Sequence, residues 1–371
     1  MKLLMVLLLL ASITHAQTTN ADANLSRLTE AVNAINENQL ARAEKLLNSV
    51  LATSRNDADA LNLLGVIRAK QDRVADAERL FRRALASLPS HVSAHINLAE
   101  LLLTHDRSAE AMPVLLQAHK LAPDRPEIIL KLATLYADMK QYDKAEEYLT
   151  SALALQPDDV PTLRALAKVA RATGNLEKAL SHLLQARRLA PDSRAVLYDF
   201  GVTTLQMGLV LDALPVFDRL HRDYPREPAY LYGLAAAHWT KGEVAETIRL
   251  LNDYVALQPR NASGWYLLGA ALLRQEQTSE AQRALQRSLS LKADPDTEYL
   301  LGASFEKAGD RDAAINTFRK VVQSRPDHAA AHAALGTAYR ETGRYTEARV
   351  ELERAVALDA NDLRANYQLG L

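Results

Sequence analysis

The residues best suited to metal chemistry in this sequence are two pairs of histidines. His91 and His95 are four residues apart, and so are His328 and His332. Two histidines at this spacing lie on one face of a helix and can share a metal ion. No carboxylate or third histidine completes either set, and the second histidine of each pair stands where a packing side chain is expected. We therefore expect neither pair to hold a metal.

The chain contains no motif for other kinds of catalysis. It has no cysteine, which excludes disulfides, thiolate nucleophiles and cysteine-ligated zinc. The motifs G-x-S-x-G and H-E-x-x-H and a phosphate-cradling glycine loop are absent from the sequence. The formal net charge of −1 gives no electrostatic case for nucleic acid or an anionic membrane. We expect a protein that is not an enzyme, has no cofactor and does not bind nucleic acid.

Three basic residues suggest binding rather than catalysis. Arg164, Lys168 and Arg171 are spaced i, i+4 and i+7, so they share one helix face. The guanidinium group of arginine can form two parallel hydrogen bonds with a carboxylate. The alternative is a solvated basic helix surface that needs no partner.

Aromatic residues form a regular series further along the chain, with Trp239 nearby. Tyrosine offers a large contact area and a polar tip, so such a series could grip an extended peptide. The alternative is that these tyrosines are ordinary members of a repeated packing pattern. The series consists of Tyr198, Tyr232, Tyr266, Tyr299 and, after a gap at Ala333, Tyr367.

The elements that position these residues repeat every 34 residues. Prolines mark the period at Pro89, Pro123, Pro157, Pro191, Pro225 and Pro259. A series of small residues keeps the same period at Gly65, Ala99, Ala133, Ala167, Gly201, Ala235 and Gly269 and continues to Gly302, Gly336 and Gly370. Alanines run from Ala43 to Ala348, with Thr247 as an exception, and a large apolar residue follows each of them four residues later. Turn glycines recur at Gly174, Gly208, Gly242, Gly309 and Gly343.

One unit shows the physical meaning of the pattern. Apolar residues at helical spacing run from Thr162 to Ala172, and Gly174 then breaks the helix because glycine accepts the left-handed backbone of a tight turn. A second amphipathic helix follows from Leu176 to Leu189, and Pro191 ends it. The small residues of each unit are expected where its two helices cross closely. Low aromatic content, 5%, also favours helices over strands.

This pattern resembles the tetratricopeptide repeat. It is clearest where Leu335-Gly336 is followed by Tyr339, Gly343 and Ala348, and Trp265 stands three residues before Leu268-Gly269. The resemblance implies an all-α, right-handed α-solenoid superhelix of tandem helix-turn-helix repeats. It also implies that the first helices line a concave groove in which ligands lie. The tyrosine series would then face the groove, as would the basic residues of repeat five, whose place and charge are similar to those with which some members hold a peptide's terminal carboxylate.

The repeat pattern sets the expected boundaries. About ten repeats cover residues 24–360, and residues 361–371 form the first helix of a partial eleventh repeat or a cap. One residue is missing near Ala293 and Asp294, which should change the stacking there. Residues 17–23 are expected to be a linker.

The N-terminus predicts export. Lys2 is followed by an apolar stretch from Leu3 to Ile13, which is about half the roughly 20 residues needed to span a bilayer. A small residue, Ala16, precedes Gln17, so residues 1–16 are predicted to be a cleaved signal peptide. An uncleaved anchor is the alternative. We expect a periplasmic or secreted protein.

The function expected from these features is that of a non-catalytic scaffold or adaptor that binds a peptide or protein in the concave groove. One alternative is the exported part of a longer protein whose catalytic or anchoring domain lies beyond Leu371. Another is a structural role in which the unfinished C-terminal face drives end-to-end self-association.

Overall fold

The structure, a computed structural model, describes residues 20–370. The predicted signal peptide and the first residues of the predicted linker lie outside the described residues. Within them the chain is all-α, and its helices follow one another in antiparallel pairs, which confirms the predicted fold class. The described helices cluster into two compact units, unit 1 within residues 20–189 and unit 2 within residues 190–370.

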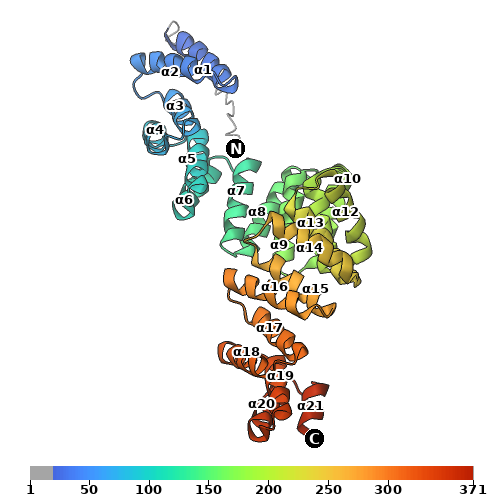
Figure 1. The fold of residues 1–371 in the computed structure, drawn as a ribbon. Coiled ribbons are helices and arrows are strands. Elements are labelled where there is room, and N and C mark those ends of the chain that lie inside the picture. Colours follow the sequence, from blue (N-terminus) through green and yellow to red (C-terminus); the bar gives the residue numbers. More distant parts are fainter. Residues whose placement is uncertain (1–19, 371) are drawn as a thin grey trace. The chain divides into compact units, whose positions relative to one another are not determined.

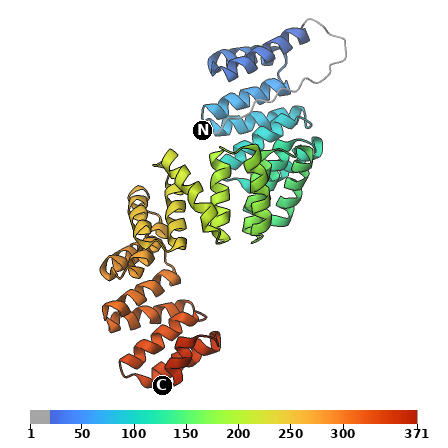
Figure 2. The same ribbon diagram turned by 90° about the vertical axis from the view of Figure 1, so that its right-hand side faces the viewer.

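Unit 1 contains five helix pairs, blue to green in Figures 1 and 2. Its first helices are α1 (Asn20–Asn36), α3 (Ala58–Lys70), α5 (Val92–Thr104), α7 (Pro126–Asp138) and α9 (Val160–Ala172). Its second helices are α2 (Leu40–Thr53), α4 (Val74–Ser87), α6 (Ser108–Leu121), α8 (Tyr142–Leu155) and α10 (Leu176–Leu189). The first of these helices begins at Asn20, ahead of the repeat boundary expected at residue 24.

Unit 2 contains five more pairs and a final short helix. Its first helices are α11 (Arg194–Gln206), α13 (Pro228–Lys241), α15 (Ala262–Arg274), α17 (Pro295–Ala308) and α19 (Ala329–Glu341). Its second helices are α12 (Val210–Asp223), α14 (Val244–Leu257), α16 (Thr278–Leu291), α18 (Arg311–Ser324) and α20 (Tyr345–Leu358). The final helix is α21 (Leu363–Gly370), which lies in the segment expected to be a partial eleventh repeat or a cap.

The core of each unit is built from the residues that mark the repeat. Ala77 and Phe81 of α4 are fully buried, as are Ala213 and Phe217 of α12. The small residues of the first helices lie against these large ones, as predicted. A Cβ atom added to Gly65 would lie 2.6 Å from the ring of Phe81, a distance that two carbon atoms do not tolerate.

The turns inside the pairs share one backbone conformation. Gly174 and the four other turn glycines have positive φ, which is the left-handed region that the sequence predicted for them. In the pairs that lack a turn glycine, the residue at the same place is also left-handed. These non-glycine residues are Asn38, Asp72, Asp106, Lys140 and Glu276.

Candidate functional site

The tyrosine series lies on the first helices of unit 2. Tyr198, Tyr232, Tyr266 and Tyr299 occupy the same place in α11, α13, α15 and α17, and each side chain is half-buried. Part of each ring therefore stabilises the fold, and part reaches solvent. Tyr367 has the same place in α21 and is mostly exposed.

The buried edges of these rings pack on the second helices. The ring centroids of Tyr198 and Phe217 are 6.2 Å apart, those of Tyr232 and Tyr254 are 5.1 Å apart, and those of Tyr299 and Phe318 are 5.8 Å apart. Burial raises the pKa of Tyr232 above its ordinary value. Burial raises the pKa of Tyr266 too, and the charges of Asp296 and Asp294 add to the effect. These hydroxyls stay neutral at physiological pH and can donate hydrogen bonds.

Apolar residues continue the surface along each helix. On α11, Val202 and Leu205 follow Tyr198 at i+4 and i+7, and residues at this spacing share one face. Ala236 and Trp239 follow Tyr232 in the same way on α13, and Ala303 follows Tyr299 on α17. We call this surface the aromatic face; it consists of Tyr198, Val202, Leu205, Tyr232, Ala236, Trp239, Tyr266, Tyr299 and Ala303, all half-buried against the core of unit 2.

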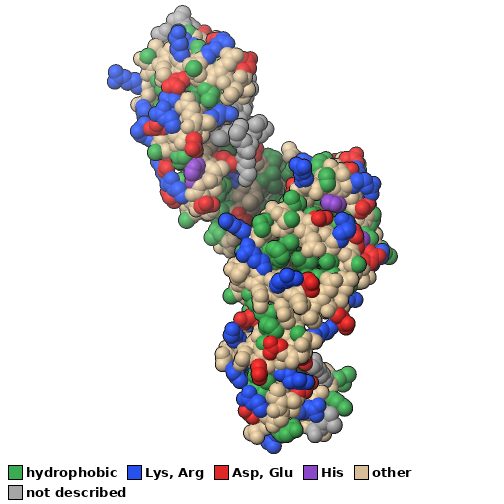
Figure 3. Space-filling view, in the orientation of Figure 1, with side chains coloured by type: hydrophobic (Ala, Val, Ile, Leu, Met, Phe, Trp, Pro, Cys, Tyr) green, Lys and Arg blue, Asp and Glu red, His purple; other side chains and the backbone are tan. Residues whose placement is uncertain are grey.

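The aromatic face is continuous between neighbouring helices. First helices α11 and α13 contact each other, and so do α15 and α17. The Arg274 guanidinium of α15 lies over the Trp239 ring of α13, 5.3 Å from its centroid. Figure 3 shows hydrophobic side chains gathered where Figure 1 places α13 and α14.

The basic residues of the sequence prediction lie on α9 of unit 1. Arg164, Lys168 and Arg171 hold the places that Tyr198, Val202 and Leu205 hold on α11. The Lys168 side chain is exposed. Arg164 and Arg171 are half-buried, and both already take part in interactions within the protein. The structure thus places the basic residues in unit 1 and the aromatic residues in unit 2.

The histidine pairs have structural roles. The Nδ1 atom of His91 accepts a hydrogen bond from the backbone N–H of Ala94, 3.2 Å away, and so caps the N-terminus of α5. The proton then resides on Nε2, which lies 3.1 Å from the Asp59 carboxylate. His328 repeats this arrangement: its Nδ1 accepts from Ala331, and its Nε2 lies 3.4 Å from Asp296.

The second histidine of each pair shares the role of a tryptophan. The Nε2 atom of His95 is 3.0 Å from the carbonyl oxygen of Pro89, and that of His332 is 3.1 Å from the carbonyl oxygen of Pro326. The indole N–H of Trp265 makes the same bond to Pro259 at 3.1 Å. Each ring thus fastens a first helix to the proline that precedes it. No cluster of three metal-ligating side chains occurs within residues 20–370.

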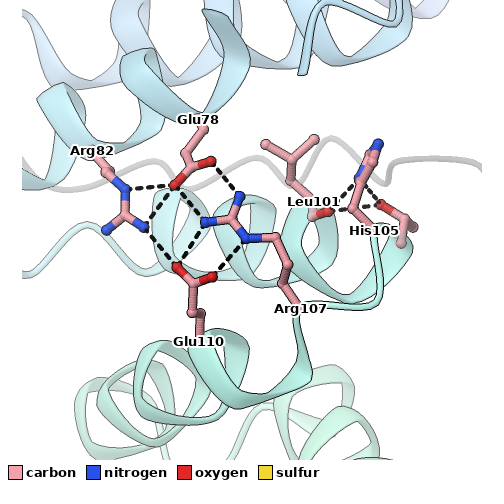
Figure 4. Close-up of polar contacts among 7 residues, drawn as sticks. Glu78, Arg82, Leu101, His105, Arg107 and Glu110 are labelled. Atoms are coloured by element: carbon pink, nitrogen blue, oxygen red, sulfur yellow. Dashed lines mark hydrogen bonds and ion pairs between the residues drawn. The ribbon is translucent and has the colours of Figure 1, made fainter. Parts of the chain in front are cut away.

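Sequence reasoning missed a charged network that joins repeats two and three (Figure 4). The Arg107 guanidinium lies 2.6 Å from Glu78 of α4 and 2.7 Å from Glu110 of α6. Arg82 pairs with Glu78 at 2.7 Å and approaches Glu110 at 3.7 Å. Arg107 holds the pKa of both carboxyl groups below the usual range. The signal was present in the sequence as opposite charges on successive second helices, but only the register of the two helices brings them together.

Sequence reasoning also missed a hollow between repeats three and four. Its volume is about 430 Å³, and its walls come from the end of α6, the start of α7 and the C-terminal part of α8. Its lining residues are His119, Pro123, Asp124, Ile129, Glu147, Tyr148, Ser151, Ala154 and Leu155. We call it the α6–α8 hollow. None of the helices within the described part of the chain has the length and apolar character needed to cross a membrane.

Comparison with known proteins identifies the repeat. Family profiles described as tetratricopeptide repeat match residues 28–90, 68–126, 125–192 and 306–369. Residues 206–288 match a profile described as anaphase-promoting complex, cyclosome, subunit 3. A search of curated protein sequences finds no match.

Solved structures share the fold at low sequence identity. A chain of the APC/C hetero-tetramer Cut9–Hcn1 is 13% identical over 95% of this chain and 84% of that chain, with a TM-score of 0.57. The pilF protein of Pseudomonas aeruginosa is 20% identical over 57% of this chain and 96% of that chain, with a TM-score of 0.52. The type IV pilus biogenesis factor PilW is 20% identical over 57% and 98%, with a TM-score of 0.51.

The tandem helix pairs define an all-α solenoid, an architecture that serves as a scaffold for protein interactions. The chain belongs to the tetratricopeptide-repeat family.

Proposed function

We propose that this chain is an exported, non-catalytic scaffold that binds an extended peptide segment of another protein along the aromatic face of unit 2. The observation that supports the proposal is the row of half-buried tyrosines on successive first helices, with small or apolar residues one turn further on. Rings fixed by packing lose little entropy on binding and offer both apolar contact and a hydroxyl. Such rings are typical energetic centres of protein interfaces.

The spacing of the helices suits an extended ligand. Packed helices lie about 8–10 Å apart, and an extended chain advances about 3.3 Å per residue. About every third residue of a bound peptide would therefore meet a new tyrosine. Ala236 and Ala303 leave space between the rings for the side chains of that peptide.

Lys168 supports a second candidate, a basic site on α9 for a carboxylate. Its exposed ammonium stands between Arg164 and Arg171 on one helix face. A single pull-down experiment can test both candidates, because the two surfaces lie in different units.

The test is a pull-down from the native envelope extract with the chain from residue 17 onward. Ala270 follows Tyr266 at i+4 on α15, as Ala236 follows Tyr232 on α13, and both are half-buried. In one variant, Ala236→Glu and Ala270→Glu fill this part of the surface with charge; the fold already carries Glu100 at the same place on α5. A second variant is Lys168→Glu. The control is Leu211→Glu, since Leu211 is 77% exposed on the second helix α12. Partners lost only in the Ala236/Ala270 variant support the aromatic face, and partners lost only in the Lys168 variant support the basic site. Equal recovery from all four proteins would contradict both.

Fluorescence then tests the captured peptide directly. The chain has two tryptophans, and Trp265→Phe leaves Trp239 on the aromatic face as the only one. Binding there should shift the emission of Trp239 in this variant. Saturable binding without any change in Trp239 emission would place the peptide elsewhere.

Export rests on the apolar stretch that follows Lys2. When the full chain is produced in a bacterium, we expect it in the periplasmic or secreted fraction with Gln17 as its first residue. A chain that retains Met1 in the membrane fraction would support an anchor instead, and one that retains Met1 in the cytoplasm would contradict export.

A further inference from the structure

The α6–α8 hollow is a second surface, built differently from the aromatic face and confined to unit 1. Its volume of about 430 Å³ falls within the range of roughly 300–1,000 Å³ that is common for binding pockets. Ile129 forms a buried wall, and Leu155 is an exposed apolar residue at the edge, 45% accessible. The hollow therefore combines apolar walls with room for a large side chain.

Aromatic packing holds one wall rigid. The Tyr148 ring of α8 stacks on the Tyr136 ring of α7, with centroids 5.5 Å apart. The His119 ring of α6 meets Tyr148 edge-on at 5.4 Å. Lys144 lies over the outer face of this stack, 5.1 Å from the centroid of Tyr136. Tyr148 is thus fixed from both sides, and it presents its remaining edge to the hollow.

Two carboxylates complete the lining. Asp124 stands in the turn before α7, and Glu147 stands on α8 beside Tyr148; both are exposed. Neither forms an ion pair with another residue in the described part of the chain, whereas the adjacent Glu146 pairs with Lys178. The hollow is therefore a negatively charged, aromatic-lined site without an internal counter-ion.

The other repeats show that this chemistry is not imposed by the fold. Three repeats later, His221 stands at the place of His119, but Arg226, Arg249 and Leu250 replace Asp124, Glu147 and Tyr148. In the other repeats, the place of Glu147 is held by Lys45, Arg79, Pro113, Ser181, Pro215, Arg249, Arg283, Asn316 and Val350. Glu147 is the acidic exception, and it coincides with the tyrosine and with Asp124.

We propose that the α6–α8 hollow binds a lysine or arginine side chain of a partner protein, with its cationic head between Asp124 and Glu147. The aliphatic stem of the basic side chain would lie along Tyr148 and Leu155, as such stems do on apolar surfaces. Charge-assisted hydrogen bonds to the carboxylates would fix the head. An apolar residue next to the basic one would cover Leu155 and Ile129.

The experiment uses a dye-labelled peptide, Gly-Ser-Leu-Arg-Leu-Ser-Gly, and the same peptide with norleucine in place of arginine. Each is titrated into the chain from residue 17 onward, and anisotropy reports binding. We expect the arginine peptide to bind, with an affinity that falls as salt is added. The norleucine peptide should bind at least about tenfold more weakly, since charge-assisted bonds are the stronger kind.

Variants locate the site. Asp124→Asn with Glu147→Gln should weaken binding of the arginine peptide by about tenfold or more, and Tyr148→Leu, which copies Leu250, should also weaken it. Asp158→Asn is the matched control, because Asp158 holds the place of Asp124 one repeat later, and it should bind normally. The Ala236→Glu/Ala270→Glu variant should also bind normally, which separates this inference from the proposed function.

Three outcomes would overturn the proposal. One is equal binding of the two peptides. Another is full affinity in the Asp124/Glu147 variant. If binding is then lost only in the Ala236/Ala270 variant, the peptide occupies the aromatic face instead. The third is no binding to the unmodified chain at millimolar peptide. Circular dichroism of each variant verifies the helical fold.

Discussion

At the scale of single residues, the left-handed turn residue has a different free-energy cost in different repeats. Lys140 has φ of 58° and Glu276 has φ of 64° at the place where other repeats have glycine. A side chain in this region costs roughly 1–2 kcal/mol, and glycine loses about 0.4–1 kcal/mol more than alanine through the freedom of the unfolded chain. The first effect is the larger, so these two residues are destabilising as they stand.

We predict that Lys140→Gly or Glu276→Gly stabilises the protein by about 0.5–1 kcal/mol. The midpoint of urea unfolding, followed by circular dichroism, measures the change. Gly174→Ala is the reverse control and should destabilise, because Gly174 has φ of 79°. If glycine lowers the midpoint at Lys140, the side chain there contributes a contact that outweighs the backbone cost.

The histidine caps give a second prediction at this scale. His91→Ala should lower stability by about 1 kcal/mol, as loss of an N-cap does, because the N–H of Ala94 loses its side-chain acceptor and keeps only the His91 carbonyl oxygen. His91→Asp should retain most of the stability, since Asp57 and Asp159 cap α3 and α9 from the same place. Thermal unfolding of the unmodified chain and of the two variants measures these differences in stability. A His91→Asp protein as unstable as the alanine variant would mean that the contact with Asp59 matters more than the cap.

At the scale of the helix pair, complementary sizes decide the packing. Phe81, Phe217 and Phe318 each face a glycine on the preceding helix, namely Gly65, Gly201 and Gly302. Where the large residue is Leu115, the small residue is Ala99. Each of these phenylalanines thus faces a glycine, whereas leucine faces alanine in this pair and glycine in others, as Leu285 faces Gly269.

This matching predicts a rescue. Gly65→Ala should destabilise by about 1–3 kcal/mol through overpacking, because its Cβ would lie 2.6 Å from the enclosed Phe81 ring. Adding Phe81→Leu recreates the pair of Ala99 and Leu115 and should recover part of the loss. A double-mutant cycle measures the coupling, expected within about 0.5–3 kcal/mol. Additive effects would show that the two sites do not touch in the folded protein.

The helix pairs also show what the sequence could and could not predict. The 34-residue period, the turn glycine Gly174 and the helix-ending Pro191 were sufficient to predict the helix pairs and where their helices end. These features act within one repeat. Gly233 and Gly264 fell outside every series in the sequence, yet a Cβ on Gly233 would lie 2.2 Å from Phe217 and one on Gly264 would lie 2.5 Å from Tyr254. Such contacts depend on the side chains of the neighbouring repeat, which periodicity does not specify.

The candidate sites, too, were predictable from the sequence only in part. The tyrosine series follows from the spacing of residues along the first helices, so its members could be predicted by residue number. The extent of burial of its rings was not, because it depends on Phe217, Tyr254 and Phe318 of the second helices. The α6–α8 hollow needs the register of α6 against α8, and the sequence contains no local signal for that register.

At the scale of the whole molecule, a repeat array is stabilised by each repeat and by the interfaces between neighbours. The Glu78–Arg107 pair belongs to such an interface, as does the pair of Glu44 and Arg68, whose closest atoms are 2.5 Å apart. Hydrogen bonds from these arginines lower the pKa of Glu44 and Glu78. A carboxyl group whose pKa is lowered by folding contributes stability that is present above its unfolded pKa, about 4.3 for glutamate.

This contribution should be lost as the pH falls below about 4.3, through the lower folded pKa values of the two groups. Thermal unfolding of the chain should therefore show a falling midpoint in this window and broader transitions, since weaker interfaces uncouple neighbouring repeats. The Glu78→Gln variant removes one titrating group and should have a flatter pH profile than the unmodified chain. Glu37→Gln is the control, because Glu37 lies in the turn between α1 and α2, away from the interface between repeats two and three. Identical profiles for the Glu78→Gln variant and the unmodified chain would show that solvent screens the network too strongly for it to couple the repeats.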